Sequence, residues 1–225
     1  MKTTSSGIRE IESLRFAQPV SYEDAFTAQI KRRTAIQEGH ACNTLFLLEH
    51  TPVITLGRDA DTAHLLRDEA EIEALGIDVC PADRGGDVTY HGPGQLVAYP
   101  VLRLGDWKRS INWYLRALEE VLIRVLAEYG LEGERVENLT GVWVEGAKVA
   151  AIGVGIHKWV TYHGIALNVN PDPGHWGLIV PCGIADRSIT SLKQLLGTAP
   201  PMAEVTDRFE RCFRGHFVNE WTDAG

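Results

Sequence analysis

Cysteine is scarce in this sequence and never clustered. Four of the 225 residues are cysteines, and no two of them form a Cys-x-x-Cys pair. This spacing fits neither a disulfide framework nor a structural zinc site. The sequence therefore predicts no metal, and thiols of this kind are typical of the reducing cytoplasm. The four cysteines are Cys42, Cys80, Cys182 and Cys212.

Long apolar runs and an excess of positive charge are also missing. No stretch approaches the ~20 apolar residues that a membrane-spanning helix needs. Residues 1–7 lack the apolar centre of a signal peptide, and we expect them to form a flexible tail. The net charge of −8 argues against binding to nucleic acid or to anionic lipid. We expect neither nucleic acid nor a membrane among the partners.

Nucleotide-binding motifs are absent from the sequence too. It has no Gly-x-Gly-x-x-Gly after a predicted strand and no Gly-x-x-x-x-Gly-Lys-Ser/Thr loop. Its 44% hydrophobic and 23% charged residues are ordinary for a globular protein. No repeat or linker divides the chain. We therefore expect one domain over residues 1–225 and no cofactor.

Hydrophobic periodicity predicts three substantial helices. One begins at the N-cap Ser21, runs toward Gln37 and stops at Gly39. A second is capped by Ser110 and carries a core-facing stripe from Ile111 through Leu115 to Tyr129. A third, near the C-terminus, buries one edge. Its apolar residues step by four, at Val205, Phe209, Phe213 and Phe217.

The remaining pattern predicts short strands on both sides of the long second helix. Residues 145–147 are predicted to form the loop of an antiparallel hairpin. Strands before and after a helix, with at least one hairpin, indicate an α+β or mixed α/β fold. The expected strands are 44–49, 53–57, 77–80, 96–102, 141–144, 148–154 and 163–169, and further short helices are expected at 67–75 and 191–196.

The densest polar motif precedes the predicted strand at 96–102. A glycine pair lets the backbone bend and approach a ligand, and a following strand would hold the bend in place. The simplest interpretation is a turn leading into a core strand. The crowding of Arg, Asp, Thr, Tyr and His favours a binding loop instead. The motif comprises Arg84, Gly85, Gly86, Asp87, Val88, Thr89, Tyr90 and His91.

Cys182 is the candidate nucleophile because it stands on a bend, between Pro181 and Gly183. The alternative is an ordinary buried cysteine. A thiol with a pKa near its usual value of about 8.5 is mostly protonated at neutral pH, so catalysis needs a nearby cation. Lys148 is one candidate, although a lysine beside a hairpin loop is commonly solvated. His91 and His163 remain alternatives.

Several motifs occur in the order found in one known family. Residues 84–100, 146–154, 163–170 and 181–192, with a further segment at 49–58, together resemble the bacterial lipoyl(octanoyl) transferases. That resemblance implies the fold of biotin and lipoate protein ligase catalytic domains. Such a domain is α+β, with a larger mixed sheet and a smaller sheet flanked by helices.

The resemblance also implies an activity. Members transfer octanoate from the thioester of octanoyl-acyl carrier protein to one lysine of a lipoyl-accepting domain. The acceptors are lipoyl domains of 2-oxoacid dehydrogenases and the glycine cleavage H protein. The reaction is the first step of endogenous lipoate synthesis and needs no cofactor.

By the same resemblance, Cys182 is the acyl-thioester nucleophile, and Lys148 lowers the pKa of its thiol and shuttles protons. The implied acyl-substrate contacts are Arg84, Gly85, Gly86, Asp87, Val88, Thr89, Tyr90, His91, Ala151, Ile152, Gly153, Gly164, Ile165 and Ala166. Arg187 is bulkier than the pattern leads us to expect at the rim of the site.

Three finer expectations follow for the site. Val88, Tyr90 and Ile152 are expected to line an apolar slot for the octanoyl chain. Backbone N–H groups near Gly183 or Gly86 are expected to stabilise an oxyanion. The third expectation is a basic docking patch for the acidic carrier protein, made by Arg84, Lys158 and Arg187.

Other functions remain open from the residues alone. An ATP-dependent lipoate or biotin ligase on the same fold would activate a free acid and would not need Cys182. An amidotransferase would move octanoyl groups between lipoyl domains with a cysteine elsewhere in the chain. A non-catalytic acyl-binding protein would need neither Cys182 nor Lys148.

Overall fold

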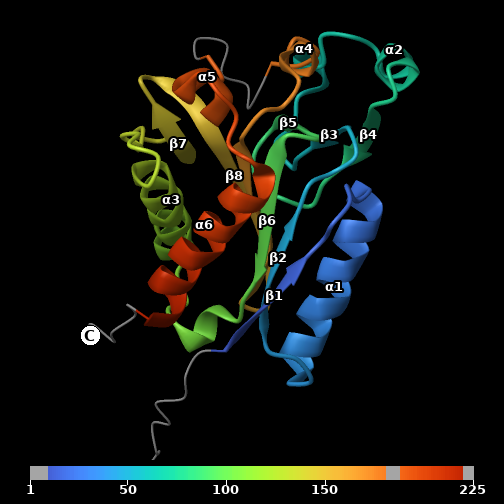
Figure 1. Cartoon of the computed structure of the whole chain (residues 1–225). Helices are drawn as coiled ribbons and strands as arrows, with labels where there is room; N and C mark the ends of the chain where they lie inside the picture. Colours follow the sequence, from blue (N-terminus) through green and yellow to red (C-terminus); the bar gives the residue numbers. More distant parts are fainter. Residues whose placement is uncertain (1–9, 181–187, 220–225) are drawn as a thin grey trace, which may run out of the picture.

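A computed structural model describes residues 10–180 and 188–219 of the chain. Its centre is a six-stranded sheet, and a three-stranded sheet lies beside one end of it (Figure 1). In spatial order the large sheet contains β1 (Ile11–Arg15), β2 (Asn43–Leu48), β6 (Gln95–Val101), β9 (Val160–Asn168), β8 (Ala147–His157) and β7 (Gly141–Val144). The small sheet contains β4 (Asp78–Pro81), β3 (Val53–Leu56) and β5 (Val88–His91).

Both sheets are mixed, which confirms the predicted fold class. β1 pairs with β2 in parallel and β3 with β4 in parallel, whereas the other pairings are antiparallel. The β7–β8 pair is the antiparallel hairpin expected around residues 145–147. Strand β1 was not predicted, because its five residues carry too weak an alternation to stand out.

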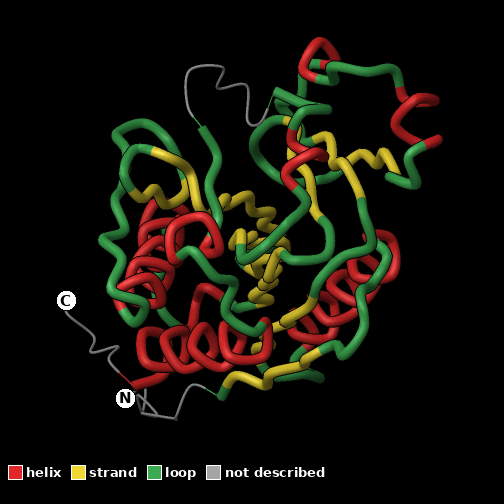
Figure 2. Tube along the Cα trace, turned by 45° about the horizontal axis from the view of Figure 1, so that its top comes forward, coloured by secondary structure: helices red, strands yellow, loops and turns green. Residues whose placement is uncertain are grey.

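Helices cover both faces of the large sheet (Figures 1 and 2). On one face lie α3 (Ile111–Ala127) and α6 (Met202–Arg214), and on the other lies α1 (Tyr22–Glu38). The short helices are α2 (Glu69–Ala74), α4 (Pro173–Trp176) and α5 (Leu192–Leu196), and a π-helical turn spans Gly215–Asn219. Among the described residues no helix is both long enough and apolar enough to cross a membrane.

The helix boundaries follow the predicted capping chemistry. The Ser21 side chain accepts a hydrogen bond from the N–H of Asp24, and Gly39 ends α1 in the left-handed conformation. Ser110 caps α3 in the same way through the N–H of Trp113. Capping satisfies N–H groups that would otherwise lack a partner at the helix start.

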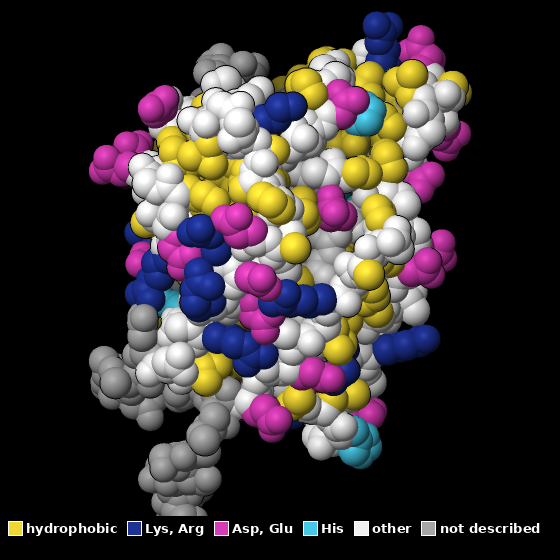
Figure 3. Space-filling model, viewed as in Figure 1, with side chains coloured by type: hydrophobic (Ala, Val, Ile, Leu, Met, Phe, Trp, Pro, Cys, Tyr) yellow, Lys and Arg dark blue, Asp and Glu magenta, His cyan; other side chains and the backbone are white. Residues whose placement is uncertain are grey.

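The main core lies between the large sheet and helices α3 and α6. The predicted α3 stripe is buried there for most of its length, as are the four residues of the C-terminal helix pattern. The two ends of the stripe differ, because Ile111 is 48% exposed and Tyr129 is only partly buried. The outer side of α6 is charged, and Figure 3 shows Lys/Arg and Asp/Glu side chains alternating over it. Ion pairs such as Arg214–Glu210 account for that alternation.

The motif at residues 84–91 is half loop and half strand. Residues 84–87 form bends, whereas Val88–His91 is strand β5, which pairs with β3 in the small sheet. The predicted loop therefore ends four residues earlier than expected. The reason is tertiary: the β5 residues gain backbone hydrogen bonds only because β3 lies alongside them.

Candidate functional site

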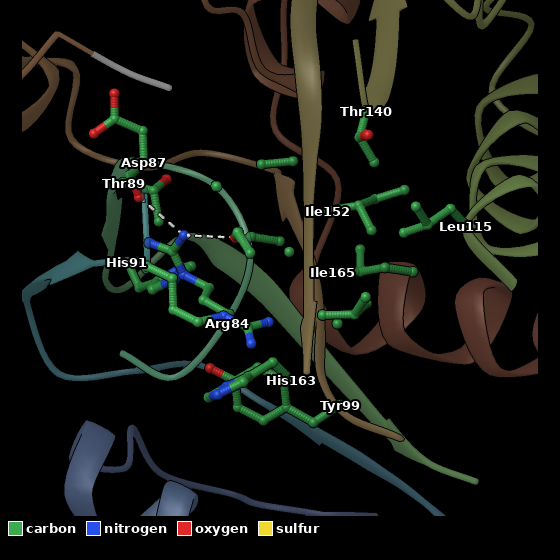
Figure 4. Close-up of a pocket in the computed structure, with 18 of the residues that line it drawn as sticks. Arg84, Asp87, Thr89, His91, Tyr99, Leu115, Thr140, Ile152, His163 and Ile165 are labelled. Carbon is green, nitrogen blue, oxygen red and sulfur yellow. Dashed lines mark hydrogen bonds between the residues drawn. The ribbon is translucent and has the colours of Figure 1, made fainter. Parts of the chain in front are cut away.

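A cavity of about 550 Å³ opens between the 84–87 loop and strands β8 and β9 of the large sheet (Figure 4). It brings together almost all the residues that the sequence motifs single out. Those lining the cavity are Arg84, Gly85, Gly86, Asp87, Val88, Thr89, His91, Lys148, Ala151, Ile152, Gly153, Gly164, Ile165 and Ala166. Segments far apart in the sequence thus converge on one space.

Tyr90 is the described candidate that does not line the cavity. Successive residues of a strand point to opposite sides, so Tyr90 faces away while Thr89 and His91 face the cavity. The Tyr90 ring packs in the small core with Ile54 and Ile72, and its hydroxyl contacts His175 Nδ1 at 2.7 Å. Tyr90 therefore does not line the cavity. Ile152 lines it, and Val88 borders it although its side chain packs with Tyr90 in the small core.

Cys182 lies outside the described residues, together with Gly183 and Arg187. The described chain resumes at Ser188, which lies directly beside Lys148. The Lys148 N–H donates to the Ser188 carbonyl at 2.9 Å, and the Thr190 N–H donates to the Lys148 carbonyl at 3.0 Å. The described part of the cysteine motif is therefore hydrogen-bonded to the backbone of Lys148 itself.

A bulge in β8 decides which way Lys148 points. Val142 of β7 pairs with Ala150, but the next residue, Trp143, pairs with Lys148, so Val149 has no partner. Val149 and Ala150 both enter the main core as a result. The extra residue turns Lys148 to the cavity side of the sheet, where regular alternation would have placed Val149.

Two residues of β7 position the Lys148 side chain. Its ammonium nitrogen lies 5.1 Å from the centre of the Trp143 ring, a favourable cation–π distance. A Cβ at Gly141 would come within 2.8 Å of the Lys148 Cε, so only glycine leaves room for the lysine stem. Gly141 also has a φ of +139°, which side-chain-bearing residues rarely adopt.

Arg84 builds the loop rather than presenting charge at the surface. Its guanidinium donates to the Asp87 carbonyl at 2.9 Å and to the carbonyl and hydroxyl of Thr55 at 2.9 and 2.7 Å. The residue is only 7% exposed. It therefore adds no exposed charge to the basic docking patch that we expected.

Backbone N–H groups of the loop also have hydrogen-bond partners within the protein. Gly86 N–H donates to the Asp59 carboxylate at 2.9 Å, and Gly85 N–H donates to the Val154 carbonyl at 3.1 Å. The Gly86 N–H is therefore not an open oxyanion donor. The alternative expectation, N–H groups near Gly183, falls outside the described residues. Gly153 lets the loop lie this close to β8, since a Cβ there would be 3.0 Å from Arg84 Cδ.

One end of the cavity is apolar. Leu115 from α3 and Ile152 and Ile165 from the sheet gather on the same side of the view in Figure 4, opposite Arg84 and His91. Ile111 also lines this end. The sequence placed Ile111 and Leu115 only in a core stripe, and its single hint was their position in the first turns after the Ser110 cap.

The other end is polar, and several uncharged rings lie there beside Arg84. His50, His91 and His163 lie there with Tyr22 and Tyr99, in ring contacts of 5.7 to 6.3 Å. Burial is the main cause that lowers the pKa of His50 to about 4 and those of His91 and His163 to about 3. These histidines are therefore uncharged near neutral pH.

His163 is held in an uncommon backbone conformation. Its φ is +56°, rare for a residue other than glycine, and it turns the ring toward α1, where it stacks on Phe26 at 5.4 Å. Gln29 of α1 accepts a hydrogen bond from the His163 N–H at 2.7 Å and fixes this geometry. The sequence pattern gave no sign of the left-handed residue.

Further lining residues were not among the predicted site residues. Arg58, Tyr99 and Val154 lie within the family motifs, whereas Tyr22, Asn138, Leu139, Thr140 and Ile156 lie in segments that no motif marked. Their positions depend on tertiary packing, since each belongs to an element whose sequence reads as ordinary core or turn. Across residues 10–180 and 188–219, no group of three or more His, Cys, Asp or Glu side chains is arranged to hold a metal ion.

Comparison with known proteins places this chain in a family. The family described as the lipoyl protein ligase A/B catalytic domain matches residues 18–214. An octanoyltransferase of Chloroflexus aggregans is 55% identical over 80% of the chain and 84% of its own length. An octanoyltransferase of Solibacter usitatus is 47% identical over 89% of the chain and 90% of its own length.

Solved structures agree on the fold. A lipoate protein ligase from T. acidophilum with bound lipoic acid superimposes with a TM-score of 0.72 at 15% identity, over 92% of this chain and 85% of its own. The biotin protein ligase from Aquifex aeolicus reaches 0.51 at 14% identity, over 93% and 69%. At these identities the likeness concerns the fold.

Proposed function

Because the chain belongs to the lipoyl protein ligase A/B catalytic-domain family, we propose that it is an octanoyltransferase. It would move an octanoyl group from octanoyl-acyl carrier protein to a lysine of lipoyl domains, those of 2-oxoacid dehydrogenases and of the glycine cleavage H protein. The reaction would take place in the cytoplasm. The observation that carries the proposal is the cavity, which joins an apolar end to Lys148 and the motif loop.

The chemistry proceeds by two acyl transfers at Cys182. The Cys182 thiolate attacks the thioester carbon of the donor, the bond to the carrier sulfur breaks, and the leaving thiolate takes up a proton. Attack by the acceptor amine then forms an amide and breaks the bond to Cys182. A thioester is already activated, so no ATP is required, and the stability of the amide drives the sequence forward.

Lys148 supplies a proton site for both transfers. As an ammonium it stabilises the Cys182 thiolate, and as a neutral amine it accepts the proton that the acceptor amine loses. Support comes from the bulge at Val149, which turns the lysine to the cavity side, and from Ser188 and Thr190, which attach the post-cysteine segment to its backbone. The apolar end at Leu115 and Ile152 offers a hydrophobic surface for the acyl chain.

The decisive test is an acyl adduct on Cys182. Wild-type protein incubated with octanoyl-acyl carrier protein should gain one octanoyl mass that hydroxylamine removes, and Cys182→Ser should not. Cys80→Ser is the matched control and should keep the adduct, since Cys80 lies on β4 outside the cavity lining. Octanoyl transfer by wild type without any adduct would disprove the covalent route.

The alternative functions predict different outcomes when the protein is given donor, or ATP and free octanoate. Consumption of ATP with free octanoate, without reaction of the acyl carrier protein, would indicate a ligase of the kind found among the structural neighbours. Binding of the donor without transfer would indicate a non-catalytic acyl-binding protein. Replacement of Lys148 by alanine should slow adduct formation and move thiol alkylation to higher pH, whereas Lys193→Ala, at an exposed position, should change neither.

A further inference from the structure

A buried row of polar side chains connects the two sides of the cavity. His91 Nδ1 lies 2.7 Å from Gln95 Oε1, and Gln95 Nε2 lies 2.9 Å from Asn168 Oδ1. Asn168 Nδ2 continues the row to the Thr190 carbonyl at 3.1 Å. All four residues are buried, so water does not compete for these bonds.

Backbone carbonyls at both ends fix the direction of every bond. The Thr190 carbonyl can only accept, so the Asn168 amide nitrogen must face it and the Asn168 oxygen must face Gln95. Gln95 likewise donates to the Tyr90 carbonyl at 3.3 Å, which leaves its oxygen for His91. His91 therefore carries its proton on Nδ1, and Nε2 is an acceptor.

The row is rigid because it is built into the large sheet. Gln95 of β6 and Asn168 of β9 are direct partners in the strand register, so their side chains are neighbours on one face. His91 lines the cavity at one end. At the other end the Thr190 N–H donates to the Lys148 carbonyl. The row thus joins the strand after the motif loop to the segment that follows Cys182.

We propose that Gln95 and Asn168 are positioning residues for two different parts of the octanoyl transfer, an inference that rests on the proposed function. Gln95 holds His91 with Nε2 ready to accept a hydrogen bond from the primary amine of the acceptor lysine. Asn168 holds Thr190, and with it the post-cysteine segment, against Lys148. Of the two substrates at their reacting atoms, only the acceptor amine carries an N–H that an acceptor nitrogen can orient.

The charges around His91 make the proposal testable by pH. The groups that act on it most strongly include Gln95 on β6, His50 after β2, Arg84 in the loop and His163 on β9. Burial first, and then His50, Arg84 and His163, lower the pKa of His91 to about 3. Wild-type His91 thus stays neutral from pH 6 to 9, and its acceptor nitrogen is available throughout.

Gln95→Glu places a carboxylate against His91 Nδ1 with little change of shape, at the cost of the two bonds that Gln95 Nε2 donates to Tyr90 and Asn168. The bond from Asn168 to the Thr190 carbonyl is kept. The negative charge favours the protonated ring, which has no acceptor nitrogen. We expect adduct formation on Cys182 near the wild-type rate. Transfer of the octanoyl group to a lipoyl domain should be about tenfold slower at pH 6.5, the loss expected for one hydrogen bond to the reacting group, and should recover toward pH 8.5.

Asn168→Asp is the matched variant. Its remaining oxygens can still accept from Gln95, so the tautomer of His91 is kept, but no N–H remains for the Thr190 carbonyl. We expect slower adduct formation and a wild-type dependence of the transfer step on pH. Urea unfolding of each variant separates a loss of folded protein from a change in rate.

The outcomes separate the inference from the function on which it rests. Absence of an adduct in wild-type protein overturns the proposed function. A normal wild-type adduct with equal, pH-independent losses in Gln95→Glu and Asn168→Asp overturns the positioning roles and leaves a purely structural row. A pH-dependent transfer defect confined to Gln95→Glu supports the assignment of His91.

Discussion

The two faces of the six-stranded sheet differ in the chemistry that they bury. The face under α3 and α6 holds the main hydrophobic core, with side chains such as Leu118, Val121 and Phe213 fully buried. The face toward α1 and the small sheet buries His50, His163 and other polar side chains among its apolar residues. Both faces consist of alternate residues of the same strands.

This difference separates the face whose burial stabilises the fold from the face whose buried polar groups cost free energy. Apolar burial on the α3 and α6 face contributes most of the favourable free energy, since it scales with the area removed from water. Buried polar groups cost free energy unless every one is hydrogen-bonded. The polar end of the cavity lies against the polar face, whereas its apolar end borders α3. The apolar core under α3 and α6 therefore offsets the cost of the buried polar groups.

The largest effect on stability is expected on the apolar face. Phe213→Ala removes a fully buried ring that stacks on Phe217 at 4.5 Å, and should lower the free energy of unfolding by about 3–5 kcal/mol. Octanoyl transfer per folded molecule should be unchanged, because Phe213 does not line the cavity. Denaturant titration measures the change. The matched control is Phe16→Ala, a residue 39% exposed, which should cost less than about 1 kcal/mol.

The next prediction concerns a substitution that lowers activity as well as stability. Arg84→Met keeps the length and the apolar stem of the side chain but removes its bonds to Thr55 and Asp87. We expect a loss of about 1–3 kcal/mol in unfolding free energy. Activity should fall about 100-fold, because the loop that faces β8 loses its position. Arg67→Met, at an exposed site, is the control, and equal loss of activity in both would refute the structural role of Arg84.

Patterns within single elements were predictable from the sequence. The spacing of Val121 and Val125, the Ser110 cap and the four-residue steps to Phe217 each report on one helix alone, and all are confirmed. The predicted site residues from Arg84 to Ala166, with the exception of Tyr90, also converge on one cavity. The resemblance could predict this set because it covered most of the chain. Cys182 remains a prediction, since it lies outside the described residues.

Features that depend on pairing between elements were not predictable. The bulge at Val149, which turns Lys148 toward the cavity, exists only in the register of β7 against β8. The outward direction of Tyr90 follows from β5 being a strand, which requires β3 alongside. The left-handed conformation of His163 needs the contact with Gln29. No local sequence signal encodes any of these three.

The polar face should also make the protein sensitive to acid. Burial lowers the folded-state pKa of His50, His91 and His163 below the unfolded value of about 6.5. The unfolded chain therefore binds more protons as the pH falls below about 6.5. Each histidine then removes about 1.4 kcal/mol of stability per pH unit, down to its folded pKa.

One substitution isolates a single histidine. His163→Gln should make the fall in unfolding free energy between pH 6 and pH 5 shallower by about 1.4 kcal/mol. Urea titrations at stepped pH give this slope directly. An identical slope in wild type and His163→Gln would mean that His163 is not held neutral by burial.

The smallest expected effect on unfolding free energy comes from removing one tyrosine hydroxyl, and it can be compared between the two faces. The Tyr99 hydroxyl donates to His50 Nε2 at 2.7 Å, because His50 Nδ1 already donates to the Val20 carbonyl. Tyr99→Phe leaves a buried acceptor without a donor and should cost about 1 kcal/mol.

Tyr114 provides the counterpart on the apolar face. Its hydroxyl lies 3.5 Å from the Pro100 carbonyl, which also accepts from Thr161 at 2.6 Å. Tyr114→Phe therefore strands no acceptor, and its unfolding free energy should stay within about 0.5 kcal/mol of wild type. Denaturant titration of the two variants side by side measures the contrast. Equal costs would show that the two faces do not differ in how strictly they require their polar groups to be paired.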